Sequence, residues 1–398
     1  MYIPERKSLL GALLGAAAAA VLFAAACPPF GFTAAAWLVP GVLFVTTRRL
    51  PARYAFEAGL LFGVLSAGLV TRWLTDSLML GLDVSPLSAS LIAFSGITVA
   101  VGIPCGLLTM GYAYASHRVS RVDLPIVGAF LWVATEWAQA QLIGWQLLGH
   151  TQARELWLIQ VADLGGVFAV SFVVAFASIA AAEAAVAVAR GSIRFRAGAY
   201  ALILPLSTLA IAFAYGADAR SLYQTSPAAS DWSVDIGAAA YSAPLREASW
   251  RTGGVEAPAA MRPRHVSTVD HSGIRVSPLH CGDLLDTSAV RSAVTEGADV
   301  MINDCRVDWL AGAPAAATEQ HLALAVFRAV ESRRFVVRAT NDGNAELITA
   351  MGETHTEAPD GQTLTISTET TRYMQYGDRW ILLGLGASLV VVGRGRRR

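Results

Sequence analysis

Long apolar stretches follow one another along most of the sequence, and they constrain the fold more than any other feature. A helix of about 20 apolar residues spans the roughly 30 Å hydrocarbon layer of a bilayer. Seven long stretches and a shorter last one occur, at 8–26, 31–47, 55–71, 88–115, 123–142, 157–188, 197–216 and 380–392. Hydrophobic residues make up 54% of the chain and charged residues only 15%, which is unusual for a soluble protein. The sequence therefore predicts a polytopic membrane protein.

Basic residues gather in every second loop between these stretches. The clusters lie at 6–7, 48–53, 118–121, 190–196 and 394–398. Loops rich in Lys and Arg stay in the cytoplasm. The pattern therefore predicts eight spans with both termini cytoplasmic, in a bacterial inner (plasma) membrane.

This topology divides the chain into three parts. We expect a transmembrane bundle of about seven helices over 1–216, a periplasmic domain over 217–378, and a C-terminal transmembrane helix with a basic cytoplasmic tail over 379–398. The middle part differs from the others in composition, because it is polar and its apolar runs are short.

Short apolar runs in the polar part alternate with turn residues and predict both strands and helices. The expected strands are 234–241, 274–280, 299–303, 335–340, 345–350 and 363–367, and the expected helices are 284–295 and 318–332. Strands that alternate with helices favour an α/β sandwich.

Charge and cysteine spacing argue against several classes of function. The formal net charge is zero, so no global basic field favours nucleic-acid binding. The four cysteines form no CxxC or Cys/His pattern, which zinc sites usually show. We therefore expect no nucleic-acid partner, no metal and no other cofactor.

Cys281 is the candidate nucleophile. It ends an apolar run and precedes a helix-forming one, a turn that leaves the sulfur close to helix amides. Two other interpretations stay open. A free cysteine is often buried and inert, and Cys305, which follows the neighbouring expected strand, is a candidate disulfide partner in an oxidising compartment.

Motifs in both the apolar and the polar parts resemble the apolipoprotein N-acyltransferase family. The apolar part carries Pro28-Pro29-Phe30-Gly31 and similar stretches at 63–73, 136–152 and 160–172. The polar part resembles the family's carbon-nitrogen hydrolase (nitrilase) domain at 297–304, at Trp309, at 318–352 and at 371–378. The resemblance implies a multi-span α-helical membrane bundle plus a periplasmic α/β domain, a nitrilase-like αββα sandwich.

The resemblance also implies an activity. This is the transfer of a fatty acyl group from a phospholipid donor to the amino-terminal cysteine of a lipoprotein, through a thioester on Cys281. Such a transfer needs a carboxylate that accepts the thiol proton and a lysine that stabilises the oxyanion. The implied partners are therefore a phospholipid, a lipoprotein and the membrane.

The polar part departs from the family's catalytic pattern. The only lysine in the chain is Lys7, which the topology places on the cytoplasmic side. Neither Glu247 nor Glu256 matches the family's glutamate motif. Too few residues precede Cys281 for the family's first strands, so we expect a shortened sandwich.

Nearby polar residues are weak candidates for the missing roles. Asp283 and Asp304 are candidate bases, and Arg306 is a candidate oxyanion donor. Arginine has a pKa above about 12 and does not take part in proton transfer, so it does not replace lysine.

Four further residues have both a functional and a structural interpretation. Glu136 lies within an apolar stretch, where an ionisable group is costly; it is either a lipid- or substrate-binding residue or a buried helix contact. Trp145 and Trp309 are weak lipid-binding candidates, and Trp145 also fits an interfacial aromatic belt. His321 is expected to be a packing or capping residue on its helix.

Two functions follow from these observations. The first is an N-acyltransferase with Cys281 as nucleophile. The alternative is a catalytically inactive relative that binds lipid or lipoprotein as a membrane scaffold, because the family's glutamate and lysine are not found. A transporter is disfavoured, since the spans show no pair of broken helices in matching halves. Whether the protein is an enzyme stays open at this point.

Overall fold

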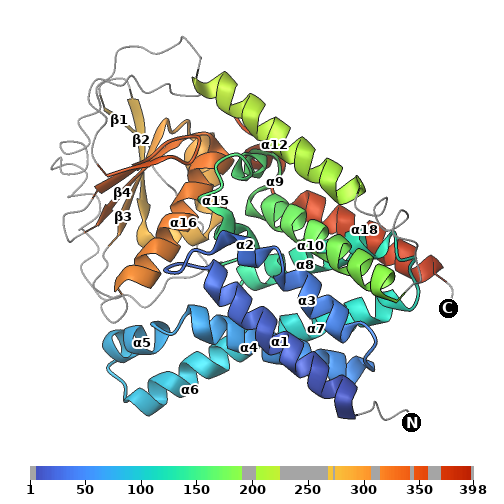
Figure 1. Cartoon of the computed structure of the whole chain (residues 1–398). Coiled ribbons are helices and arrows are strands. Elements are labelled where there is room, and N and C mark those ends of the chain that lie inside the picture. The colour runs from blue at the N-terminus through green and yellow to red at the C-terminus, as the bar shows by residue number, and fades with distance from the viewer. Residues whose placement is uncertain are drawn as a thin grey trace.

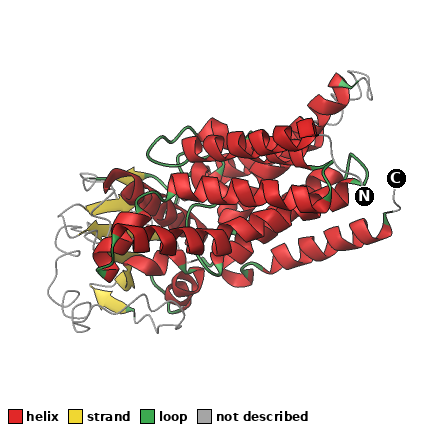
Figure 2. Cartoon of the chain, turned by 90° about the horizontal axis from the view of Figure 1, so that it is seen from below, coloured by secondary structure: helices red, strands yellow, loops and turns green. Residues whose placement is uncertain are grey.

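A computed structural model describes residues 6–190, 203–224, 268–271, 274–305, 314–340, 345–356 and 369–395. These residues form a bundle of helices with a small mixed sheet at one end (Figure 1). The start of α1 (Arg6–Ala26) and the end of α18 (Arg379–Arg394) lie at the opposite end of the bundle (Figures 1 and 2). The predicted combination of a helical part and an α/β domain is confirmed.

A helix occurs in each of the eight predicted apolar stretches. Between α1 and α18 the elements of the bundle are α2 (Thr33–Ala36), α3 (Val39–Thr47), α4 (Ala52–Val70), α5 (Leu74–Leu82), α6 (Pro86–Ile97), η1 (Thr98–Gly102), α7 (Ile103–Ser116), α8 (Leu124–Ala140), η2 (Leu148–Gln152), η3 (Ile159–Val161), α9 (Ala162–Gly165), α10 (Val167–Ala189) and α12 (Ile203–Gln224). Helix α5 was not expected from the sequence.

Four helical segments are long and apolar enough to cross a membrane. Among the residues described, these are Leu9–Ala26, Ala52–Val70, Pro86–Ser116 and Val167–Ala189. Large apolar side chains on the outer faces of the helices are exposed, including Leu14, Leu91, Phe94, Leu107 and Leu383, as expected for contact with lipid. The protein is therefore a membrane protein, and the number of eight crossings stays a prediction.

Small residues bring α4 and α7 into close contact. A Cβ atom added to Gly59 would lie close to the carbonyl oxygen of Cys105, and one added to Gly63 would lie 2.9 Å from the Cα atom of Gly102. Such backbone approaches are typical of helix packing in membranes, where van der Waals contact replaces the hydrophobic effect.

Among the described residues, six strands form one sheet and lie in sequence order. They are β1 (Val269–His271), β2 (Ile274–His280), β3 (Val300–Cys305), β4 (Phe335–Thr340), β5 (Ala345–Ile348) and β6 (Thr354–His355). β2, β3 and β4 are parallel, and the other pairs are antiparallel. The second sheet of a complete αββα sandwich is not among the residues that the structure describes.

Four of the predicted strands are confirmed as β2, β3, β4 and β5, and two of these have the predicted bounds. The expected strands 234–241 and 363–367 lie outside the described residues. The expected helix 284–295 divides into η4 (Cys281–Leu285) and α15 (Thr287–Thr295), and the helix expected at 318–332 begins earlier, as α16 (Pro314–Ser332). A short α17 (Arg372–Tyr376) precedes α18.

Helix α16 lies between the sheet and the bundle (Figure 1). Its inner face is buried, and both Phe327 and Val330 are fully covered. Its buried polar side chains, described below, bond to the bundle and to η4. α16 therefore positions the α/β domain on the membrane helices.

Candidate functional site

Cys281 is the first residue of η4 and directly follows β2. It thus lies at the carboxyl end of a central parallel strand, the edge at which α/β sheets usually place their functional groups. The predicted strand-to-helix turn at Cys281 is confirmed. The residue is partly buried.

Cys281 is disulfide-bonded, whereas Cys27 and Cys105 are free and buried. The register pairs His280 with Asp304, so Cys281 and Cys305 each follow a paired residue on neighbouring strands. Adjacent strands lie about 4.8 Å apart, which suits the Cα separation of a disulfide. This register meets the backbone requirement of the predicted Cys281–Cys305 bridge, although the Cys305 side chain lies outside the described ones.

Among the described side chains, His321 on α16 is an ionisable one that contacts the Cys281 sulfur. The distance from His321 Nε2 to Cys281 Sγ is 3.7 Å, and Nε2 lies 3.1 Å from the backbone oxygen of Cys281. Only 1% of His321 is exposed. Burial lowers the pKa of His321 to about 4, and the charge of Arg338 acts in the same direction. The imidazole is therefore neutral at physiological pH.

No local sequence pattern places His321 beside Cys281, because 40 residues separate them. Packing and capping were the expected roles for a histidine on this helix. The usable signal was the Gln320-His321 pair, which belongs to the motifs that resemble the family. Contact between α16 and η4 brings the two residues together.

The other predicted polar candidates are not brought together by the described structure. A carboxylate oxygen of Asp283 accepts the backbone N–H of His280 at 2.8 Å, so this side chain caps η4. The side chain of Asp304, and the whole of Arg306 and Trp309, lie outside the described residues. Their proposed roles stay predictions.

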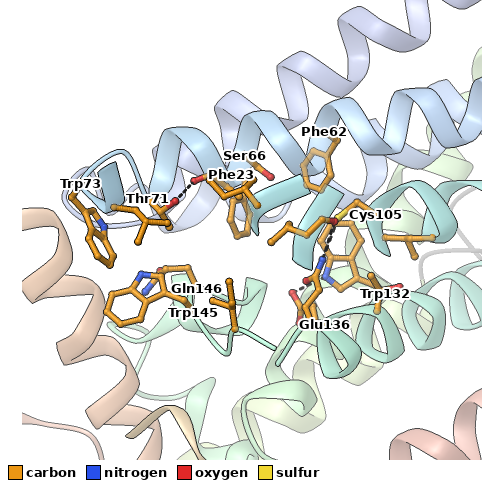
Figure 3. Close-up of a pocket in the computed structure, with 18 residues that line it drawn as sticks. Phe23, Phe62, Ser66, Thr71, Trp73, Cys105, Trp132, Glu136, Trp145 and Gln146 are labelled. Carbon is orange, nitrogen blue, oxygen red and sulfur yellow. Dashed lines mark hydrogen bonds between the residues drawn. The ribbon is translucent and has the colours of Figure 1, made fainter. Parts of the chain in front are cut away.

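An apolar cavity of about 160 Å³ runs between α1, α4, α7 and α8. Figure 3 shows Trp73 and Trp145 at one end of the cavity, and Cys105, Trp132 and Glu136 at the other. Most of the lining side chains are apolar or aromatic, as in pockets that take hydrophobic ligands.

Glu136 is buried in the cavity wall and is hydrogen-bonded. Its carboxylate accepts the indole N–H of Trp132 at 2.9 Å and the backbone N–H of Leu148 at 2.7 Å. The amide of Gln139, on the same helix, donates to Cys105 Sγ at 3.4 Å. Glu136 thus joins α8 to η2 and also lines the cavity, so its two interpretations are compatible.

The Trp145 end of the cavity lies beside the Cys281 region. The ring centroids of Trp145 and His321 are 6.4 Å apart. A Cβ atom added to the preceding Gly144 would lie 3.2 Å from the backbone oxygen of Leu285, at the end of η4. The arrangement therefore places a thiol position, a neutral imidazole and the end of an apolar cavity next to one another.

Gln320 holds this junction together. Its side-chain oxygen accepts the indole N–H groups of Trp73 at 3.1 Å and Trp145 at 2.7 Å. Its amide nitrogen donates to the backbone oxygens of Pro28 and Val70, both at 3.0 Å. Gln320 is fully buried, so one side chain joins α16 to three separate segments of the bundle.

Comparison with known protein families gives two matches. Residues 19–180 match the model of the apolipoprotein N-acyltransferase N-terminal domain, and residues 246–379 match the carbon-nitrogen hydrolase model. The two matches correspond to the helical part and the α/β part of the structure.

Several curated proteins resemble the chain, and each carries the name apolipoprotein N-acyltransferase. The protein of Geobacter metallireducens is 30% identical over 186 residues, which are 44% of this chain and 33% of that protein. The protein of Gloeobacter violaceus is 26% identical over 171 residues, 41% of this chain and 32% of that protein. The protein of Rhodopirellula baltica is 43% identical over 70 residues, 17% of this chain and 12% of that protein.

Each match thus spans a third or less of the relative's own length. The first family model nevertheless matches the helical part, and the second matches the α/β part that follows it. Both parts of the chain therefore resemble the apolipoprotein N-acyltransferase family.

Proposed function

We propose that the protein transfers a fatty acyl group from a phospholipid to the amino-terminal cysteine of a lipoprotein, with Cys281 as nucleophile. The proposal places it in a bacterial inner membrane, with both termini cytoplasmic and the α/β domain periplasmic. The alternation of basic loops along the sequence supports this orientation,.

One observation carries the proposal, namely that the Trp145 end of the apolar cavity adjoins Cys281. An acyl chain that lies in the cavity, between α4 and α8, would bring its carbonyl group toward the sulfur. Holding a reacting carbonyl and a nucleophile together lowers the activation barrier by converting a bimolecular step into a unimolecular one.

The reaction requires the reduced form of Cys281. A dithiol reductant first opens the disulfide by thiol–disulfide exchange, giving two protein thiols and an oxidised reductant. The Cys281 thiolate attacks the ester carbonyl, and the ester C–O bond breaks while the lysophospholipid oxygen takes up a proton. The lipoprotein amine then attacks the thioester, an amide forms, the C–S bond breaks, and the sulfur recovers a proton.

A second function, a scaffold that binds lipid without acylating a lipoprotein, is favoured by a different observation. Cys281 is disulfide-bonded, and Lys7, the only lysine in the chain, belongs to the first helix of the bundle, α1. Under this alternative the cavity would still take an acyl chain, but no thioester would form.

Thioester trapping separates the two functions. The protein in detergent is treated with dithiothreitol, freed of it, and incubated with a phospholipid that carries an alkyne-tagged acyl chain. Cys281→Ser serves as the matched variant, because its oxygen ester resists neutral hydroxylamine. A relative of established activity, handled in parallel, shows that the assay works.

Acyl transfer predicts a label on the wild-type protein that hydroxylamine removes, whereas any label on Cys281→Ser should resist hydroxylamine. Labelling of the active relative alone would reject the acyltransferase proposal in favour of the scaffold. If the wild-type protein is labelled equally with and without dithiothreitol treatment, the disulfide does not restrict the nucleophile.

A further inference from the structure

We infer that His321 is a catalytic hydrogen-bond donor that stabilises the Cys281 thiolate through its Nε2–H group. This inference rests on the proposed role of Cys281 as nucleophile. It assigns a source of positive potential at the sulfur to a chain whose only lysine, Lys7, belongs to α1.

The contacts of the ring determine which nitrogen carries the proton. Nε2 lies 3.1 Å from the backbone oxygen of Cys281, and a carbonyl oxygen only accepts hydrogen bonds, so Nε2 carries the hydrogen. Nδ1 is buried and has no hydrogen-bond partner among the described residues, which suits a nitrogen without a proton better than an imidazolium N–H. The same Nε2–H group lies 3.7 Å from Cys281 Sγ.

The electrostatic surroundings also favour a neutral donor over a proton acceptor. Arg338 on β4 is buried and paired with Glu346 on β5, and its charge disfavours an imidazolium at His321. On η4, the Asp283 carboxylate is bonded to the backbone N–H of His280. A buried, neutral imidazole that polarises a reacting centre is an established catalytic arrangement.

The position of His321 is fixed by its neighbours. Gln320, the preceding residue, makes four hydrogen bonds to the membrane bundle, and Trp145 lies against the imidazole at an interplanar angle of 35°. A donor that is held in place before the reaction needs no reorganisation as charge develops on the sulfur.

The test is the pH profile of Cys281 alkylation by iodoacetamide in the dithiothreitol-reduced full chain, with no acyl donor present. Mass spectrometry of the Cys281 peptide measures the alkylation rate of Cys281 separately from the rates of the other thiols. His321→Leu removes the donor, whereas the side-chain amide of His321→Gln places an N–H group near the Nε2 position. His355→Leu, on the edge strand β6, controls for the loss of a histidine.

We expect His321→Leu to slow alkylation at pH 7 about tenfold by raising the thiol pKa about one unit, as loss of a charge-assisted hydrogen bond would. His321→Gln should stay within about threefold of the wild type, because an amide N–H also stabilises a thiolate. His355→Leu should have no effect.

Equal alkylation rates for the wild type and His321→Leu would overturn the inference. A rate for His321→Gln as low as that of His321→Leu would also overturn it. The glutamine amide donates a hydrogen bond but cannot act as a base, so that result would indicate that His321 accepts the thiol proton instead. If His321→Leu does not fold, the wild-type profile decides alone. A single ionisation below the ordinary thiol pKa of about 8.5 supports the donor, and one at or above it contradicts the donor. If the pKa of the Cys281 thiol is lowered but no thioester forms, the role of His321 as donor is supported and only the acyltransferase proposal is rejected.

Discussion

Glu331 is a fully buried carboxylate of α16, and its partners come from α10 and from α16 itself. It accepts the backbone N–H of Val167 at 2.8 Å and forms an ion pair with Arg328. Arg328 in turn donates to the backbone oxygen of Leu284 at 2.9 Å and to the hydroxyl of Thr287 at 2.9 Å. This network connects α10, α16 and the η4 segment that begins at Cys281, so its protonation affects the base of the site.

Burial raises the pKa of Glu331 to about 7 from 4.5, and the charge of Arg328 opposes this rise. Between these pH values the folded protein binds more protons at Glu331 than the unfolded chain does. The contribution of this carboxyl to stability is therefore full below pH 4.5 and is lost as the pH rises toward 7.

We predict that the stability of the wild type relative to Glu331→Gln decreases by about 2 kcal/mol from pH 5 to pH 7. Thermal unfolding in detergent at several pH values measures this difference. The buried His150 and His321 titrate in both proteins and cancel. Glu319→Gln, on a partly exposed face of α16, should show no such slope, and a pH-independent difference for Glu331→Gln would contradict the raised pKa.

At this scale the sequence predicted the position of Cys281 but not its surroundings. Cys281 was found because a strand-to-helix turn can be recognised from local residues alone. His321 was given a packing role, because its contact with Cys281 depends on how α16 packs on η4. Side-chain contacts between elements depend on the tertiary arrangement, which periodicity does not specify.

At the scale of elements, Gly166 allows α9, α10 and α17 to meet. Its φ is +69° and its ψ is −172°, a conformation that is essentially restricted to glycine. A Cβ atom at this position would overlap the ring of Tyr373 on α17. Tyr373 is buried and donates to a carboxylate oxygen of Asp378 at 2.9 Å. Only glycine therefore fits between these helices.

We predict that Gly166→Ala destabilises the protein by about 3 kcal/mol, through backbone strain and overpacking against Tyr373. Thermal unfolding gives the magnitude, and proteolysis of the α17 region shows where the structure opens. Gly68→Ala in α4 is the matched control, because a Cβ atom there meets no atom within 4 Å. Equal effects of the two substitutions would show that the close contact at Gly166 is unimportant.

The elements themselves were mostly predictable. β2 and β4 have the predicted bounds, since each is a run of β-branched and apolar residues that ends at polar ones. Helix α5 (Leu74–Leu82) was missed because Thr75, Asp76 and Ser77 interrupt its apolar residues. The sequence predicted that β3 lies beside β2, which is confirmed. The rest of the strand order and the strand directions were not predicted, because they depend on long-range pairing rather than on local pattern.

At the scale of the whole molecule, a buried ion pair joins the end of α16 to the membrane bundle. Arg333 is fully buried, and its guanidinium donates to a carboxylate oxygen of Asp163 on α9 at 2.6 and 3.1 Å. It also donates to the backbone oxygen of Ala350, beside β5, at 3.1 Å. The hydroxyl of Tyr215 on α12 donates to the same carboxylate at 2.9 Å. One arginine thus contacts both parts of the protein.

Arg333 directly follows the last residue of α16, Gln320 lies in the first half of the helix, and each bonds to the bundle. Attachments at separate points along a helix fix its direction. The distance between the Cys281 position and the Trp145 end of the cavity therefore depends on both. Removing the Arg333 attachment should loosen the α/β domain without altering the residues that contact Cys281.

We predict that Arg333→Met costs about 3–5 kcal/mol, because it leaves the Asp163 carboxylate buried without its cation. Arg333→Met combined with Asp163→Leu should recover part of this loss, since replacing both partners of a buried pair by apolar groups costs less than replacing one. Hydrogen exchange measured by mass spectrometry should rise in α16 and in β5 for the single variant and return toward the wild type in the double variant. Additive losses in the double variant would mean that the two side chains stabilise the protein independently, and the attachment of α16 would then depend mainly on Gln320.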